Sequence, residues 1–245
     1  MKFKKNIVYA FLLFLLIILI ISISYARESI VDYYNLIPIK LLDEYRYQLQ
    51  FKNNNWITRS NANYEIRPIV DIKNGYLKIK DAGTGGGAVE HELVLYRTPE
   101  GNDIIGVNIT QFDGLGHICK LRFYKPAENQ WMDITNDVLP KVDLSRFMDD
   151  NTKLNMEKFS KLIEGIEFLY RLPRIGTTMN VKIELDRFIM IHSENGKKPM
   201  SGVKEIINNI KYQEIKLIWD KKNSKFNFGE KTLFMPSDVI KNYLK

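Results

Sequence analysis

A series of short alternating runs, separated by turn sequences, occupies residues 71–135 and constrains the fold more than any other feature. Asn74-Gly75 lies between two such runs, and this dipeptide tolerates the positive φ angles of a tight hairpin turn. Further turn sequences follow at 99–102, 113–116 and 126–129, a spacing typical of antiparallel sheets. The pattern predicts a meander with strands at 71–73, 76–80, 92–97, 103–112, 117–124 and 131–135.

Helical and strand periods alternate in the second half of the chain. Met156, Phe159, Leu162 and Ile163 recur at helical spacing, and so do the apolar residues of 203–210, for which Ser201 is the expected N-cap. Strands are predicted at 166–172, 178–185, 212–219 and 226–228, and a C-terminal helix after Pro236-Ser237 with Val239, Ile240 and Tyr243 as its apolar stripe. The expected fold class is α+β, dominated by antiparallel β-sheet with a few short helices.

Three regions are expected after the N-terminal segment. Residues 27–140 form the β-meander region, and residues 153–245 form a mixed region of helices and strands. The Asp-rich stretch 141–152 between them is the expected linker. The sequence leaves open whether the two regions are separate domains or one domain.

The first 26 residues have the pattern of an export signal. Three lysines precede an apolar run at 7–23, and Ser24-Tyr25-Ala26 places small residues where a signal peptidase requires them, which predicts cleavage between Ala26 and Arg27. The apolar run also approaches the roughly 20 residues that span a bilayer, so an uncleaved anchor formed by residues 7–26 is the alternative. Either way, the domain is expected outside the cytoplasm, in the periplasm, on the cell surface or secreted.

Composition excludes several classes of function. The net charge of +7 includes no tract of five like charges, so a nucleic-acid-binding arm is not indicated. Cys119 is the single cysteine, which excludes an intramolecular disulfide and a thiolate metal cluster, and it is expected to be structural. No cofactor or metal is predicted, and the partner is left unknown.

The most conspicuous local sequence is the glycine loop, Gly83–Gly87. Glycine-rich loops that hold phosphate lead into a helix, whereas residues 89–97 after this loop have a strand pattern. A connection between two strands is therefore expected, with ligand contact as the alternative. Trp131 and Trp219 lie in strand patterns and are expected in the core or at its edge rather than on a ligand platform.

No catalytic constellation is recognisable. His91, His117 and His192 lie in separate segments without metal-ligand spacing. Glu90 and Glu92 flank His91, but neighbouring residues of a strand point to opposite faces, so the three do not form a cluster. The sequence assigns no catalytic residue and no binding residue.

Four stretches carry a resemblance to a group of proteins: 32–38, 71–75, the glycine loop, and 172–178. They resemble segments of uncharacterised exported bacterial proteins, and the likeness covers most of the chain after the leader. The resemblance implies no activity and no functional residues. The favoured hypothesis is a non-enzymatic exported protein that binds a ligand or macromolecule. The alternatives are an extracytoplasmic hydrolase with a carboxylate or histidine site, and a structural component of the envelope.

Overall fold

The computed structural model describes most of the chain that follows the leader. The described residues are 28–83, 87–98, 100, 102–127, 130–149, 156–163, 165–194, 198–199, 202–237 and 240–241. The predicted leader, its cleavage position between Ala26 and Arg27, and residues 84–86 of the glycine loop lie outside them. Within the described part of the chain, no helix is both long and apolar enough to cross a membrane.

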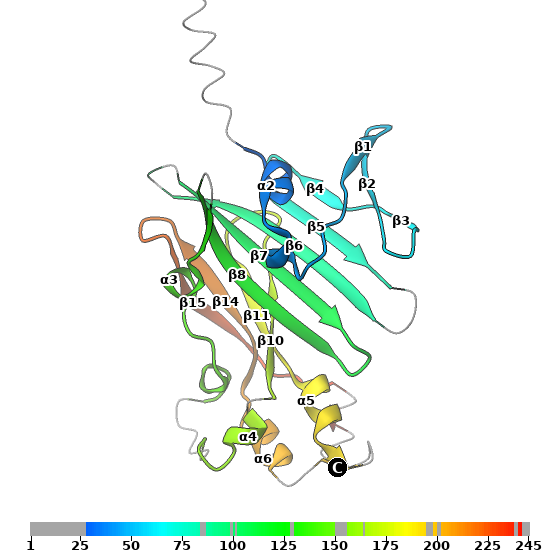
Figure 1. Cartoon of the computed structure of the whole chain (residues 1–245). Helices are drawn as coiled ribbons and strands as arrows, with labels where there is room; N and C mark the ends of the chain where they lie inside the picture. The colour runs from blue at the N-terminus through cyan, green and yellow to red at the C-terminus, as the bar shows by residue number, and fades with distance from the viewer. Residues whose placement is uncertain are drawn as a thin grey trace, which may run out of the picture.

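The predicted meander is present as a six-stranded antiparallel sheet in the order β4-β5-β6-β7-β8-β9 (Figure 1). The predicted hairpin is present, and Gly75 has a φ of +64° in its turn. The first strand, predicted at 71–73, is β4, which ends at Asp71, so the turn spans residues 72–75 rather than Asn74-Gly75 alone. β8 continues beyond the predicted end at Tyr124 through Ala127, and Thr135 begins helix α3 rather than ending a strand. The strands are β4 (Ile69–Asp71), β5 (Tyr76–Asp81), β6 (Ala88–Arg97), β7 (Asp103–Phe112), β8 (His117–Ala127) and β9 (Gln130–Asp133), followed by α3 (Thr135–Val138).

A second, four-stranded antiparallel sheet has the order β10-β11-β14-β15 and crosses behind the first (Figure 1). Its strands confirm the predictions for the second half, although β15 is longer than predicted. The connection from β11 to β14 contains helix α5, which was not predicted. The bounds are β10 (Glu167–Arg171), β11 (Met179–Glu184), α5 (Leu185–Ile191), β12 (Ser193–Glu194), β13 (Lys198–Pro199), α6 (Val203–Asn208), β14 (Tyr212–Asp220) and β15 (Lys225–Leu233).

Two of the three predicted helices are present but short. The first is α4 (Ser160–Ile163), and α6 confirms the second. The N-cap of α6 is Gly202, with a φ of +97° and no side-chain hydrogen bond, so the cap lies one residue after the predicted Ser201, which is outside the described residues. Of the predicted C-terminal helix, Ile240 and Lys241 are described, and the Ile240 amide donates to the Ser237 hydroxyl at 3.3 Å.

The N-terminal elements had no counterpart in the prediction. Helix α2 begins at a capping box in which the Ser29 hydroxyl accepts from the Asp32 amide and the Asp32 carboxylate accepts from the Ser29 amide. These elements are α2 (Ile30–Leu36), the 3-10 helix η1 (Ile39–Leu42), and the small sheet of β1 (Gln50–Lys52), β2 (Asn55–Arg59) and β3 (Glu65–Ile66).

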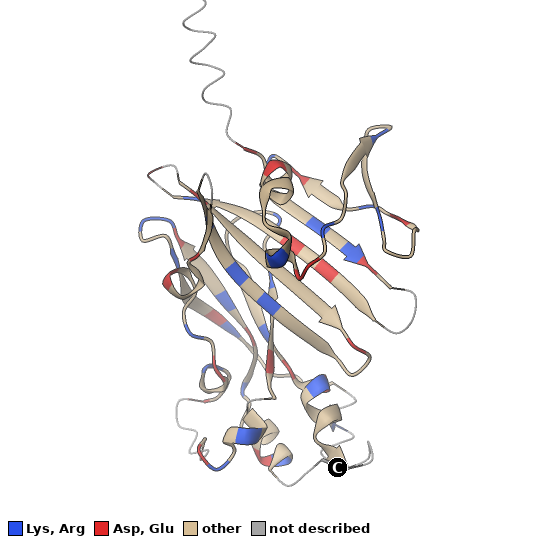
Figure 2. Cartoon of the chain, viewed as in Figure 1, with Lys and Arg blue, Asp and Glu red and all other residues tan. Residues whose placement is uncertain are grey.

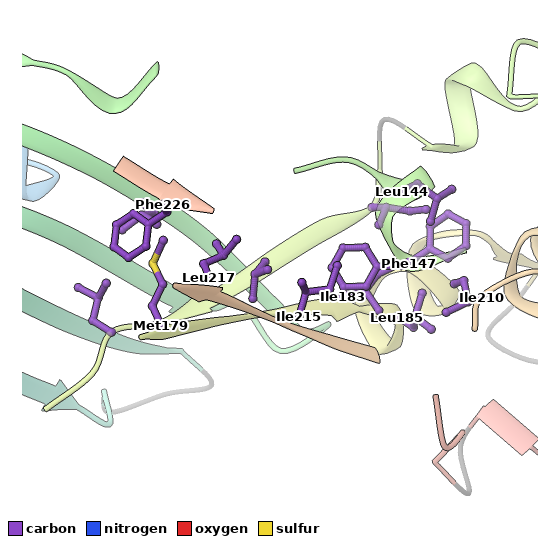
Figure 3. Packing of buried hydrophobic residues seen from close by; sticks show 14 of the residues in the cluster. Leu144, Phe147, Met179, Ile183, Leu185, Ile210, Ile215, Leu217 and Phe226 are labelled. Carbon is purple, nitrogen blue, oxygen red and sulfur yellow. The ribbon is translucent and has the colours of Figure 1, made fainter. Parts of the chain in front are cut away.

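The six-stranded sheet is a middle layer with one core on each face. Alternate side chains of its strands point to opposite faces, so Leu93 packs against the N-terminal elements while Val94 packs against the second sheet. In the core between the sheets, Figure 3 shows Met179, Leu217 and Phe226 at one end and Phe147 at the other.

Part of the predicted linker contributes to that core. Residues 144–147 form the 3-10 helix η2 (Leu144–Phe147), in which Leu144 and Phe147 are buried. Met148, also buried, forms an isolated β-bridge with Ile210.

Candidate functional site

Two pockets lie near the glycine-loop end of β6, one on each face of the six-stranded sheet. We call the first the inter-sheet cleft; it has a volume of about 400 Å³. We call the second the tyrosine pocket; it has a volume of about 370 Å³. Ala88, Val89 and Phe112 line both. The other residues used below are Lys78, Glu90, Glu92, His117 and Tyr170 in the cleft, and Tyr45, Tyr47, Tyr64, Asp81, Gly83, Gly87 and Asp113 in the tyrosine pocket.

Charged residues of β5 and β6 lie side by side on the six-stranded sheet (Figure 2). Lys78, Glu90 and Glu92 of these strands line the inter-sheet cleft. The Lys78 ammonium lies 2.5 Å from a Glu90 oxygen and 3.3 Å from Oε1 of Glu92. Glu92 is only 4% exposed, and Oε1 also accepts from the Tyr76 hydroxyl at 2.8 Å. The second oxygen of Glu92, Oε2, accepts from the side-chain NH₂ of Asn108 at 3.1 Å. Because a buried carboxyl group is costly unless it is paired and hydrogen-bonded, these contacts offset the cost of burying Glu92.

The same cluster holds the edge of β10. The side-chain NH₂ of Asn108 donates to the backbone carbonyl of Tyr170 at 2.9 Å. The backbone N–H of Tyr170 donates to the Cys119 sulfur at 3.5 Å. The Leu172 amide reaches Oε2 of Glu92 at 3.5 Å. The Cys119 thiol in turn donates to the Asn108 side-chain oxygen at 2.9 Å. Side chains of the first sheet therefore take the place of a neighbouring strand at this edge of the second sheet.

Protonation states in the cleft favour a structural role. Burial raises the pKa of the Cys119 thiol, so the sulfur is protonated at neutral pH and is not an activated nucleophile. Burial alone would lower the pKa of Lys78, but the bonds and charges of Glu90 and Glu92 raise it. His117 lies at the rim, with Nδ1 3.7 Å from a Glu184 oxygen.

Asp81 is the centre of the tyrosine pocket. It lies at the end of β5, is 9% exposed, and accepts hydrogen bonds from three groups. The Tyr47 hydroxyl donates at 3.1 Å, the Gly83 amide donates at 2.9 Å, and the Tyr64 hydroxyl donates to the same oxygen as Gly83. Tyr45 packs edge-on against Tyr47, with their ring centroids 4.6 Å apart. A carboxylate thus lies at the base of a pocket bordered by tyrosine rings.

Asp81 is ionised at neutral pH. Burial acts to raise its pKa, but the hydrogen bonds from Tyr64, Gly83 and Tyr47 outweigh it and hold the pKa below the ordinary value. The pKa of Tyr47 is raised, first by burial and then by the charge of Asp81, so its hydroxyl remains a donor. His91, against the edge of Tyr47, has its pKa lowered by burial to about 4 and is neutral.

The first glycine of the loop shapes the wall of this pocket. Gly83 has a φ of +67°, a conformation that residues with a Cβ rarely adopt. A Cβ at Gly83 would also lie 2.0 Å from the Gly87 carbonyl oxygen. Glycine at position 83 therefore lets the two ends of the loop approach each other and directs the Gly83 amide to Asp81.

The residues singled out in the sequence do not form one site. His91 is buried on the N-terminal face, while Glu90 and Glu92 face the cleft, which confirms that the three are not a cluster. The alternation already placed Glu90 and Glu92 on one face, but the sequence reasoning missed that Lys78 of the paired strand lies there with them. Among the described residues, no group of three His, Cys, Asp or Glu could hold a metal ion.

The structure confirms the prediction that Trp131 and Trp219 lie in the core or at its edge. Trp219 is 8% exposed and packs in the core between the sheets, and Trp131 is half-buried against the N-terminal core. Neither contributes to the inter-sheet cleft or to the tyrosine pocket.

The fold defines the class of this chain: an α+β protein with two main antiparallel sheets, the larger of which is covered on one face by an N-terminal segment. It is similar to a domain of an uncharacterized protein from Porphyromonas gingivalis W83, with a TM-score of 0.53 over 83% of this chain and 99% of that domain. At 10% sequence identity the likeness is one of fold alone. It agrees with the predicted resemblance to uncharacterised bacterial proteins. No family model matches the sequence, and no curated protein matches it.

Proposed function

We propose that this protein is exported and binds a small polar ligand at the tyrosine pocket without transforming it. The observation that carries the proposal is the ionised Asp81 at the base of a pocket of about 370 Å³. Small-molecule sites combine a concave, largely apolar or aromatic lining with a few polar groups, and their volumes begin at about 300 Å³. The tyrosine pocket has this composition and this size.

Binding is favoured over hydrolysis by the contacts of the acidic groups in both pockets. Carboxylate hydrolases need one protonated and one ionised carboxylate at the reacting bond. In the cleft, Lys78 binds Glu90 and Glu92 together, and Glu92 accepts further bonds from protein donors. In the tyrosine pocket, the lowered pKa of Asp81 keeps this carboxylate from acting as a general acid.

Export is supported by the N-terminal pattern described above. Intact mass of the protein recovered from its native host should correspond to a chain that begins at Arg27, outside the cytoplasm. Full-length protein that stays in the membrane fraction would favour the anchor formed by residues 7–26. Full-length protein in the cytoplasm would refute export.

The binding proposal is tested by a thermal-shift screen of small molecules from the extracytoplasmic environment. A ligand that binds only the folded state raises Tm in proportion to the logarithm of its concentration above Kd. We expect at least one compound to stabilise the wild type and not Asp81→Asn, and to be recovered unchanged by NMR after long incubation. Conversion of the compound would refute a purely binding role. Stabilisation that is equal in both proteins would place the site elsewhere.

A further inference from the structure

The charge balance of the tyrosine pocket identifies the chemistry of its ligand. Asp81 is nearly buried, and its contacts are hydrogen bonds from neutral groups. No Lys or Arg is among the residues that line the pocket. The segment from Ala82 to Ala88 carries no charged side chain either. The charge of Asp81 is therefore not balanced from within the pocket.

Two neighbouring groups do not change this balance. Asp113, the other acidic residue of the lining, is paired with Arg187 at 3.1 Å. His91 lies close enough to Asp81 to influence its pKa, but His91 is itself neutral because its own pKa is about 4. A buried anion without a cationic partner is stabilised by any ligand that brings a positive charge to it.

The walls of the pocket suit the same kind of ligand. Tyrosine rings attract cations at their faces, and cages of aromatic rings bind ammonium groups. The rings of Tyr45 and Tyr47 pack edge to face. Tyr64 is the third tyrosine that lines the pocket. A metal ion is a poorer match, because hard cations require several oxygen ligands and Asp81 already accepts three hydrogen bonds.

We propose that the tyrosine pocket binds an organic ammonium group, with Asp81 as its counter-ion and the tyrosine rings as its walls. This inference rests on the proposed binding function and specifies the class of ligand. A neutral, hydroxyl-rich ligand would satisfy hydrogen bonds but would leave the charge of Asp81 unbalanced.

The test compares a cation with an uncharged molecule of the same shape. Isothermal titration of the full mature chain with choline should show binding, and its carbon isostere, 3,3-dimethylbutan-1-ol, should bind at least about tenfold more weakly, which corresponds to about 1.4 kcal/mol. Nα-acetyl-lysine methylamide, in which the side-chain ammonium is free, serves as the probe with a primary ammonium group. Choline binding should also weaken as ionic strength rises, because salt screens the charge interaction.

Variants separate the charge from the aromatic walls. Asp81→Asn should reduce choline affinity by about tenfold or more. Tyr45→Leu should also weaken choline, and it leaves the hydrogen bonds of Asp81 intact. The matched control is Asp103→Asn, because Asp103 also accepts a tyrosine hydroxyl, that of Tyr33 at 2.8 Å, but at the opposite end of β6 and β7. Asp103→Asn should not change choline affinity.

Each outcome decides between the inference and the function on which it rests. Equal binding of choline and its isostere, with dependence on Asp81, would refute the ammonium ligand and leave a binding pocket. If choline affinity is unchanged in both Asp81→Asn and Tyr45→Leu, choline does not bind at the tyrosine pocket and the inference is refuted. Absence of binding by both ammonium probes would refute the inference, and the thermal-shift screen would then decide the broader function.

Discussion

Replacement of Glu92 by Gln should destabilise the protein strongly, because this carboxylate joins the two sheets. Glutamine offers one oxygen, so its NH₂ group would face either the Tyr76 hydroxyl and the Lys78 ammonium or the Asn108 side-chain NH₂ and the Leu172 backbone N–H, all of which donate to Glu92 in the native protein. Each buried donor left without an acceptor costs about 1–3 kcal/mol. Local adjustment recovers part of this, so we expect a loss of about 2–4 kcal/mol.

The loss is measured by urea denaturation, followed through the fluorescence of the tryptophans, one of which, Trp219, packs between the sheets. The midpoint should fall while the slope m stays constant. For a chain of this size each kcal/mol lowers Tm by about 2–4 °C, so Tm should fall by roughly 5–15 °C.

Glu90→Gln is the matched control for this prediction. Glu90 lies on the same strand and the same face, but its side chain is 26% exposed and its contact in the cleft is with Lys78. Partly exposed ion pairs contribute roughly 1 kcal/mol or less. Equal losses in the two variants, or a loss below about 0.5 kcal/mol for Glu92→Gln, would refute the role assigned to the buried carboxylate.

Three further predictions concern single positions. In urea denaturation, Gly176→Ala should lower the free energy of unfolding by roughly 1 kcal/mol, and Gly83→Ala should lower it by more. Both glycines have positive φ, but of the two only Gly83 would place a Cβ against the backbone. Equal losses in the two variants would contradict this. The folded pKa of His91, about 4, lies below the unfolded value near 6.5, so the stability due to neutral His91 is complete above pH 6.5 and falls, by at most about 3 kcal/mol, as pH drops to 4. His91→Leu should flatten that part of the stability–pH curve, and an unchanged slope would refute the assignment. Cys119→Ser should lose about 1–2 kcal/mol, and the native thiol should react slowly with a disulfide reagent; rapid labelling without unfolding would contradict a protonated, bonded thiol.

Strands with clear alternation and clear turns were predictable from the sequence. β7 was predicted at its exact bounds, and β10 and β11 nearly so, because local period and turn chemistry agree there. α5 was missed because it begins directly at Leu185, where the predicted strand ends, and its first turn is capped by Glu184, whose side chain accepts from the amides of Asp186 and Arg187. A glutamate is an unusual N-cap residue and therefore gives a weak signal.

The candidate site could not be predicted in the same way. Asp81 is a single acid at the end of a strand, and Tyr45, Tyr47 and Tyr64 come from a segment without strong periodicity. Their convergence depends on how the N-terminal segment packs over the large sheet, which is a tertiary property. The pattern around Gly83–Gly87 indicated a special backbone position, and the structure confirms it at Gly83, while residues 84–86 lie outside the described part of the chain.

The way β10 is held has a consequence for the order of folding. The large sheet pairs strands that follow one another along the chain, so its hairpins require only short loops to close and can form early. The backbone amides of Tyr170 and Leu172, at the edge of the second sheet, find acceptors only when Cys119 and Glu92 have already been brought into position by the large sheet. Pulse-labelled hydrogen exchange should therefore show protection at β6, β7 and β8 before the amides of Tyr170 and Leu172. The second sheet would use the first as its template.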